Sequence, residues 1–140
     1  MDITIRQFSL DDYDQALALW QQSGLQIRPG DDRTDIARFL ARNPELSFVA
    51  VAGGAIVGTV LGSFDGRRGY IYHLGVLPRF RRSGIARRLI GAVEKRLAAL
   101  GCRKLNLSVA EDNAAAISFY QTVGFERRHH FMGKELPKQP

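Results

Sequence analysis

The chain has 140 residues, of which 45% are hydrophobic and 24% charged, and its formal net charge is +6. This length predicts one domain spanning residues 1–140, with a composition typical of a soluble globule. No apolar run approaches the roughly 20 residues of a membrane-spanning helix, and the N-terminus lacks the apolar stretch of a signal peptide. Together with the lone Cys102, this favours a cytoplasmic protein without a membrane partner. The positive charge suits a polyanion, either nucleic acid or a phosphorylated cofactor.

The first half of the chain predicts a strand, two helices and an antiparallel hairpin. Apolar residues at period two mark the strand, and helical spacing marks the two helices. Ser9 and Asp31-Asp32 are suitable N-caps, and Gly53-Gly54 is a two-residue hairpin turn. The elements expected in this half are a strand at 3–8, helices at 9–22 and 31–43, and strands at 47–52 and 55–64.

The second half predicts strands that alternate with helices. The elements expected are a strand at 69–77, a helix from 85 to the cap at Gly101, a strand at 104–109, a helix at 113–123, and one or two strands within 125–136. The fold class is therefore α/β, with a mixed, largely antiparallel sheet of six to seven strands flanked by four helices. The predicted order is β-α-α-β-β-β-α-β-α-β(β).

The junction between the strand at 69–77 and the next helix is the strongest candidate for a binding site. Arg81-Arg82-Ser83-Gly84-Ile85-Ala86 is a basic loop that opens the helix. A helix N-terminus offers unpaired N–H groups and partial positive charge, which a pyrophosphate satisfies. Gly84 has no Cβ to keep a ligand away from the backbone. The loop alone predicts an anion site, and a merely solvated basic loop is the alternative.

Three motifs together resemble those of the GNAT N-acetyltransferase superfamily. Arg81-x-x-Gly84-x-Ala86 resembles its Arg/Gln-x-x-Gly-x-Gly/Ala signature, and residues 74–78 (LGVLP) resemble the strand end before it. Residues 113–125 (NAAAISFYQTVGF) resemble its Asn-x-x-Ala-x-x-x-Tyr-x-x-x-Gly-Phe segment. Three motifs in the family's order are more specific than any one of them. The details are most similar to a small bacterial subgroup, the YpeA-like proteins.

The resemblance implies an acetyl-CoA-dependent N-acetyltransferase of the GNAT fold. Acetyl-CoA is the implied co-substrate, with no metal, and the acetyl group passes to a primary amine by direct attack in a ternary complex. The pantetheine arm would pair with the strand end like an added strand, and the loop would hold the pyrophosphate. The implied cofactor-binding residues are Leu74, Gly75, Val76, Arg81, Arg82, Ser83, Gly84, Ile85, Ala86 and Asn113.

Two catalytic tasks have candidates in the matched motifs. The Val76 N–H is a candidate donor to the oxygen that becomes negative. Tyr120 matches the family tyrosine that protonates the leaving thiolate or orients its sulfur. The alternative for Tyr120 is a core aromatic residue, since Ile117, Tyr120 and Val123 share a helical face.

The general base is the least defined part of the predicted site. Many relatives carry a glutamate on the central strand, where this chain has Tyr70, Tyr72 and His73. His73 is a candidate because imidazole titrates near neutral pH. Strand alternation places Tyr72, the other candidate, on the opposite face from His73. Glu111, Asp112 and a water-relayed path without a dedicated base remain alternatives, and a structural role for His73 also stays open.

Other functions and partners rank lower. A catalytically silent acyl-CoA-binding module of the same fold is the main alternative to an enzyme. Nucleic acid ranks last among the partners, because aromatic residues do not interleave with a basic stripe. His129 and His130 have no companion ligands for a metal. The acceptor, a small-molecule or peptide amine, is expected to contact residues 25–35 and 127–132, and pairing of the C-terminal strands leaves a homodimer open.

Overall fold

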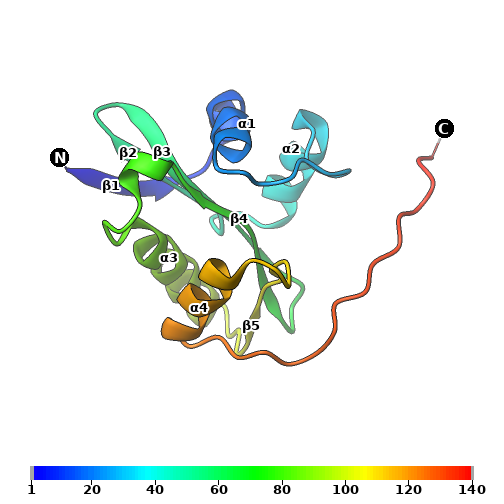
Figure 1. Cartoon of the computed structure of the whole chain (residues 1–140). Coiled ribbons are helices and arrows are strands. Elements are labelled where there is room, and N and C mark those ends of the chain that lie inside the picture. The colour runs from blue at the N-terminus through cyan, green and yellow to red at the C-terminus, as the bar shows by residue number, and fades with distance from the viewer. Residues whose placement is uncertain (1, 140) are drawn as a thin grey trace. The chain divides into compact units, whose positions relative to one another are not determined.

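The structure is a computed structural model that describes residues 2–139. The chain forms two compact units, Met1–Leu107 and Ser108–Pro140. The first unit holds the sheet and three of the helices, whereas the second holds one helix and an extended segment (Figure 1). A single acetyltransferase domain over residues 1–140 stays a prediction.

The first unit is built on one five-stranded mixed sheet with the order β1-β2-β3-β4-β5. The strands are β1 (Ile3–Gln7), β2 (Phe48–Ala52), β3 (Ala55–Phe64), β4 (Gly69–Val76) and β5 (Leu105–Asn106). Neighbours from β1 to β4 are antiparallel, and β5 is parallel to β4. Gly53 and Gly54 both have positive φ, as the predicted hairpin turn between β2 and β3 requires.

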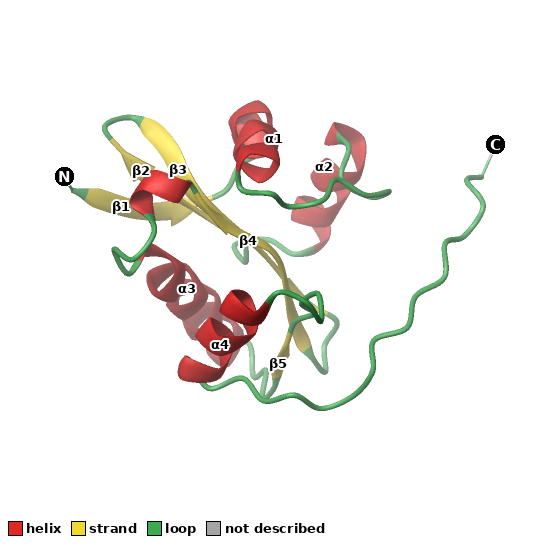
Figure 2. Cartoon of the chain, viewed as in Figure 1, coloured by secondary structure: helices red, strands yellow, loops and turns green. Residues whose placement is uncertain are grey.

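Helices cover both faces of this sheet. Helices α1 (Tyr13–Gln22) and α2 (Arg33–Arg42) lie on one face, and α3 (Ile85–Ala99) lies on the other (Figure 2). A short 3₁₀ turn, η1 (Leu10–Asp12), precedes α1, so the expected helix at 9–22 is split in two. Asp32 caps α2 as predicted, accepting a hydrogen bond from the Asp35 N–H at 2.8 Å. On α3 the buried residues are Ile85, Leu89, Ile90, Val93 and Leu97.

The second unit contains helix α4 (Ala114–Thr122). Asn113 is its N-cap, and its side-chain oxygen accepts a hydrogen bond from the Ala116 N–H at 3.1 Å. Such a bond satisfies one of the free donors at the helix start. Beyond the helix, the ring of Phe125 packs edge-on against Tyr120, with centroids 5.8 Å apart.

The predicted sheet of six to seven strands is wrong in two places. The expected strand at 104–109 is only Leu105–Asn106, because it pairs with β4 at Gly69 and Tyr70 alone. The expected strands within 125–136 do not form in the described part of the chain, where residues 125–139 are neither helix nor strand. Their apolar residues Phe131, Met132 and Leu136 are largely exposed, and a strand without a packed face has little to stabilise it.

Candidate active site

A β-bulge interrupts the centre of β4. Thr59 of β3 lies opposite Gly75, and Leu61 lies opposite Tyr72, so His73 and Leu74 together face the single residue between them, Val60. His73 has φ +48°, a left-handed conformation that is uncommon for a residue with a side chain. A bulge of this kind re-aims side chains and bends the strand. Strain of this type is maintained only where the surroundings hold it.

A chain of buried hydrogen bonds holds the bulge to α1. The Trp20 indole N–H donates to the Thr59 hydroxyl at 2.9 Å, and that hydroxyl donates to the His73 carbonyl at 2.9 Å. Trp20 and Thr59 are both fully buried. The Trp20 ring also lies against the His73 imidazole, with centroids 4.5 Å apart and planes tilted by 32°. Trp20 is a core residue, and it also supports the bulge.

The His73 imidazole is paired with a carboxylate. Its Nε2 lies 2.9 Å from Asp31 Oδ1, and both side chains are mostly buried. Asp31 is itself fixed: its Oδ2 accepts from the Arg28 N–H at 2.9 Å, and its carbonyl accepts from the Tyr13 hydroxyl at 2.6 Å. The pair therefore joins the loop between α1 and α2 to the centre of β4.

The bulge corrects the prediction that Tyr72 and His73 occupy opposite faces of the strand. Tyr72 packs edge-on against Phe39 of α2, and His73 packs against Trp20 of α1. Both helices cover the same face of the sheet (Figure 2). In a regular strand, the side chains of two consecutive residues point to opposite faces of the sheet. The extra residue in the bulge breaks this alternation between Tyr72 and His73. Both candidates for the base therefore share the face under α1 and α2.

Beyond its first two residues, β4 departs from β5 and leaves an edge without a ladder. Pairing with β5 ends at Tyr70. Farther along, the Leu77 N–H donates to the Val57 carbonyl of β3 at 2.9 Å. Because successive residues point their N–H and C=O to opposite sides, those of Val76 point away from β3. In agreement, the Val76 carbonyl accepts from the Ser23 hydroxyl at 3.4 Å and from Arg81 Nε at 3.3 Å.

The predicted phosphate loop leads directly from this edge to the N-terminus of α3. A 3₁₀ turn, η2 (Pro78–Phe80), follows β4, and the Ser83 hydroxyl donates to the Phe80 carbonyl. Gly84 is the N-cap of α3 with φ +81°, and no side chain caps the helix there. A Cβ on Gly84 would meet open space. The glycine is therefore required for its left-handed backbone, and it leaves the first N–H groups of α3 accessible.

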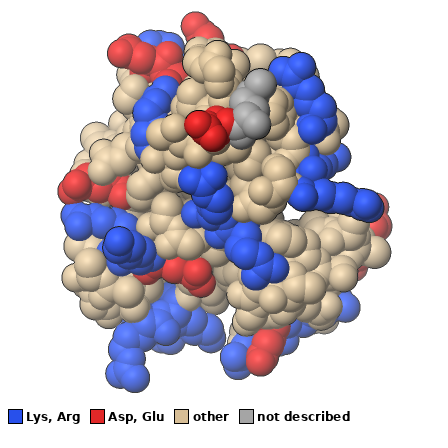
Figure 3. All heavy atoms as spheres, turned by 90° about the vertical axis from the view of Figure 1, so that its left-hand side faces the viewer, with Lys and Arg blue, Asp and Glu red and all other residues tan. Residues whose placement is uncertain are grey.

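Basic side chains surround the loop. Arg79, Arg81, Arg82, Arg87 and Arg88 are all exposed. Arg81 is turned back toward the strand through its bond to Val76, and Arg79 stacks over the Phe80 ring at 5.1 Å. The view in Figure 3 shows many Lys and Arg side chains, with scattered carboxylates among them. This is the setting that an anionic ligand requires.

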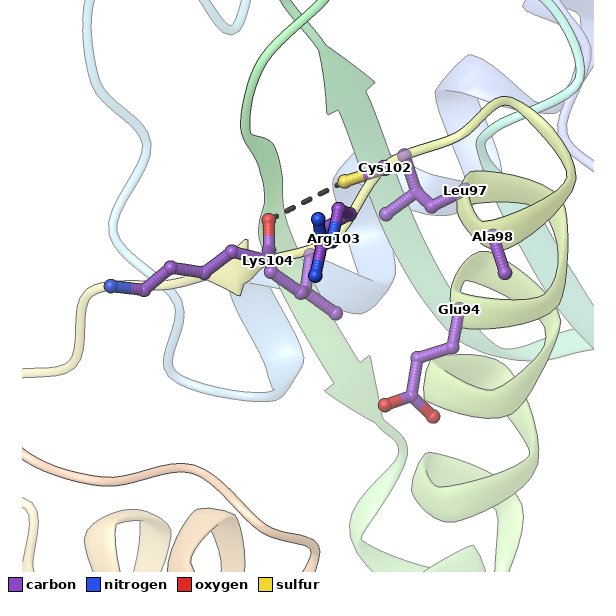
Figure 4. A pocket seen from close by; sticks show the side chains of 7 residues that line it. Glu94, Leu97, Ala98, Cys102, Arg103 and Lys104 are labelled. Atoms are coloured by element: carbon purple, nitrogen blue, oxygen red, sulfur yellow. Dashed lines mark hydrogen bonds between the residues drawn. The ribbon is translucent and has the colours of Figure 1, made fainter.

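The first unit has a hollow beside the predicted loop and another at the far end of α3. One, of about 410 Å³, is lined by Gln22, Leu77, Pro78 and Arg79, beside the free edge of β4. The other, of about 190 Å³, lies at the opposite end of α3, where Cys102 Sγ contacts the Lys104 carbonyl at 3.4 Å (Figure 4). The 15 residues of α3 separate its two ends by about 20 Å. The second hollow is therefore remote from the predicted site.

Two predicted site residues lie in the second unit. Asn113 uses its side chain to cap α4. Tyr120 packs against Phe119 and Phe125, and burial raises the pKa of its phenol above the ordinary value. A phenol is protonated at neutral pH, so Tyr120 is in the form that can donate a proton.

No local sequence pattern identifies two residues of the candidate site, which are Asp31 as the partner of His73 and Thr59 as the link to the bulge. Asp31 is a suitable helix cap, and its position among several aspartates in a loop gives no signal of a contact with a residue 42 positions away.

Residues 2–139 contain no group of three or more His, Cys, Asp or Glu side chains arranged to hold a metal. Over the same residues, none of the helices is long and apolar enough to cross a bilayer.

Comparison with known proteins identifies the family. The profile of the acetyltransferase (GNAT) family matches residues 9–125. The chain is 46% identical over 134 residues to acetyltransferase YE1169 of Yersinia enterocolitica, covering 94% of each chain. It is 45% identical over 126 residues to acetyltransferase plu1384 of Photorhabdus laumondii, covering 89% of this chain and 87% of that one.

Solved structures of similar fold agree with this result. Ard1 from Thermoplasma volcanium superimposes with a TM-score of 0.83 at 28% identity, covering 92% of this chain and 86% of that one. AAC(6')-Iy, in complex with the bisubstrate analogue CoA-S-monomethyl-acetylneamine, gives 0.78 at 26% identity, covering 97% and 100%. The chain therefore belongs to the acetyltransferase (GNAT) family, and the predicted N-acetyltransferase activity with acetyl-CoA as co-substrate is that of this family.

Proposed function

We propose that this protein transfers the acetyl group of acetyl-CoA to a primary amine, which attacks directly while both substrates are bound. One observation carries the proposal. The free edge of β4 ends at Val76, next to the basic loop and the uncapped N-terminus of α3, and His73 of the same strand is paired with Asp31 of the loop between α1 and α2. A candidate anion site, a strand edge without a partner strand and a candidate base thus occur along one stretch of about 15 residues.

The residues around the loop fit the pyrophosphate of coenzyme A. The first N–H groups of α3 have no partner within the helix, and no side chain caps them. The positive φ of Arg82 and Gly84 shapes the turn that precedes them. A bound phosphate would accept from N–H groups within residues 82–86, with Arg82 adding charge. Leu74, Gly75 and Val76 would present the strand edge to the pantetheine amides, and Asn113 would lie near this arm.

Bound acetyl-CoA supplies an acetyl thioester, whose carbonyl oxygen becomes negative as the amine attacks. The Val76 N–H points away from β3, on the same side as the Val76 carbonyl that Ser23 and Arg81 contact. We assign the Val76 N–H as the donor that stabilises this charge. Removal of an oxyanion donor typically costs about 10²–10³ in rate, so accurate placement of this strand edge matters.

His73 is the proposed general base. Most primary amines carry a proton near neutral pH and must lose it before attack. When Nε2 carries the imidazole proton and donates it to Asp31, Nδ1 is left as the acceptor for the proton of the amine. The Asp31 carboxylate then stabilises the imidazolium that forms, as the aspartate does for the catalytic histidine of serine proteases.

Tyr120 is the proposed acid that protonates the leaving thiolate. Its phenol carries a proton at neutral pH and can therefore act as the donor. Tyr72 is assigned to contact with the acceptor. Burial, together with the neighbouring Tyr70, raises the pKa of the Tyr72 phenol, so this phenol stays protonated at neutral pH and is not available as a base.

Three expectations about location and partners stay predictions: that the protein is cytoplasmic, that a homodimer is an open possibility, and that nucleic acid is the last-ranked partner.

Two measurements test the proposal. Coenzyme A at a hundred times its Kd should stabilise the fold by about 2.7 kcal/mol, which is several degrees in melting temperature. A thiol-release assay over a broad panel of amines should then detect turnover, reduced about 10²- to 10⁴-fold in His73→Ala and in Tyr120→Phe. Coenzyme A binding without turnover of any amine would favour the silent acyl-CoA module, and unchanged activity in Tyr120→Phe would remove the acid assignment.

A further inference from the structure

Three aromatic rings form a cluster on the face of β4 that carries the proposed base. We call Phe39 of α2 with Tyr70 and Tyr72 of β4 the aromatic cluster. The rings of Tyr70 and Tyr72 lie 4.7 Å apart with a tilt of 32°, and Phe39 meets Tyr72 edge-on at 5.9 Å. Tyr72 is the central member, because it contacts both of the others.

The cluster is open to a ligand. Tyr72 is 45% exposed, and Tyr70 and Phe39 are half-buried. Large aromatic side chains lose little conformational freedom when they bind, and they gain most from covering apolar surface. An exposed ring that is already fixed by two neighbouring rings is therefore a ready contact surface for a flat or apolar group.

The cluster itself is uncharged, because its members are one phenyl ring and two phenols. Asp31, the carboxylate that contacts the proposed base, is already bonded to His73. An uncharged aromatic surface favours an apolar group on the ligand and offers no carboxylate to a second ammonium group.

The bulge places this surface beside the base. Tyr72 and His73 are consecutive residues, about 3.8 Å apart at their Cα atoms, and both face α1 and α2. In a regular strand one of them would point to the far side of the sheet. An amine nitrogen that approaches His73 would therefore carry its nearest substituent over or beside the Tyr72 ring.

We infer that the acceptor carries an aromatic or bulky apolar group a short carbon linker away from its primary amine, and that the aromatic cluster binds this group. The inference rests on the proposed function and names the substrate class of the same site. Two sources share this chemistry, a free arylalkylamine and a peptide whose first residue is aromatic.

The test compares matched amines in the thiol-release assay. In the native protein, kcat/KM for 2-phenylethylamine should exceed that for ethanolamine by about tenfold or more, in line with the strength of aromatic contacts. Tyr72→Ala should reduce this ratio about tenfold, mainly through KM, whereas Tyr72→Phe should preserve it. Leu100→Ala, which removes an equally exposed apolar side chain at the end of α3, is the matched control and should leave the ratio unchanged.

Each outcome decides the inference. A peptide with N-terminal Phe that outperforms both 2-phenylethylamine and a peptide with N-terminal Gly would identify the peptide source. A native ratio of one or less, or a ratio unaffected by Tyr72→Ala in a protein that coenzyme A still stabilises, would overturn the inference. If no amine is turned over, the proposed function fails. Calorimetric binding of 2-phenylethylamine and ethanolamine to the coenzyme A complex then tests the cluster by itself, with stronger binding of 2-phenylethylamine expected and equal binding overturning it.

Discussion

His73 Nε2 and Asp31 Oδ1 lie 2.9 Å apart, and this contact joins the loop between α1 and α2 to the bulge of β4. The loop is the segment expected to contact the acceptor, and the bulge carries the proposed base. One hydrogen bond thus couples the position of the acceptor loop to the orientation of the imidazole. The other oxygen of Asp31 is bound to the Arg28 N–H, so the carboxylate is fixed from both sides.

Asp31→Asn should lower kcat by about tenfold or more while KM for acetyl-CoA changes little. The amide keeps the shape of the side chain but cannot stabilise a charged imidazole, and it can favour the wrong tautomer. Steady-state kinetics with an excess of amine measures the effect. Asp31→Glu should restore part of kcat, because it returns a carboxylate to the pair.

A double-mutant cycle separates this role from a structural one. If Asp31 acts through His73, the losses in kcat of Asp31→Asn and His73→Ala should be strongly non-additive, since the second substitution removes nothing further. Losses that multiply fully would show that the two side chains act independently, and Asp31 would then only hold the loop.

Thr59→Val should destabilise the fold and also impair catalysis. The substitution retains the shape but removes the hydroxyl that accepts from Trp20 and donates to the His73 carbonyl. A buried indole N–H without a partner costs about 1–3 kcal/mol, which urea denaturation can measure. The bulge also loses its clamp, so kcat should fall. Thr59→Ser keeps the hydroxyl and should preserve kcat. An equal kcat in the Val and Ser variants would show that the hydrogen bonds of the Thr59 hydroxyl are not needed for catalysis.

Most elements of the first unit can be predicted from the sequence, because they depend on local patterns. Asp32 as a cap, Gly53-Gly54 as a turn and Gly84 before α3 each follow from residues within one turn of the chain. The His73–Asp31 and Trp20–Thr59 contacts join residues 42 and 39 positions apart, and no local pattern reports them. The bulge cannot be predicted from the sequence for a related reason. Period-two alternation assumes a regular strand, and one extra residue moves every following side chain to the other face of the sheet.

Gly84→Ala should weaken coenzyme A binding through the backbone. The added Cβ meets open space, but φ is +81°, which costs a residue with a side chain about 1–2 kcal/mol. The loop can release this strain by changing φ, which would misplace the N–H groups at the start of α3. Calorimetric titration should therefore show a Kd for coenzyme A raised about tenfold.

Gly101→Ala is the matched control for this effect. Gly101 has φ +85°, and a Cβ there also meets open space, but it lies just beyond the opposite end of α3. Both variants should lose similar stability, and only Gly84→Ala should lose affinity for coenzyme A. Equal affinity in the two variants would mean that the backbone of this loop does not hold the cofactor.

The free energy of unfolding should fall at acid pH because the ion pair between Asp12 and Arg6 is lost there. The buried Asp12 carboxylate accepts two hydrogen bonds from Arg6, at 2.8 and 2.9 Å, and one from the Ser9 N–H at 2.9 Å. The bonds from Arg6 are the main cause that lowers the pKa of Asp12 in the folded state. A lowered pKa stabilises the fold above the unfolded value of about 3.9, and this stabilisation is lost as pH falls through the folded value.

Asp12→Asn should therefore cost about 1–3 kcal/mol of unfolding free energy at pH 7, and the difference from the native protein should shrink below about pH 4. Urea denaturation at a series of pH values between 2.5 and about 7 measures this difference. Asp14→Asn is the control, because that aspartate is 90% exposed and lies 3.9 Å from Arg33, so its loss should cost no more than about 0.5 kcal/mol. A cost for Asp12→Asn that stays constant with pH would show that the carboxylate contributes through packing, and that its charge does not stabilise the fold.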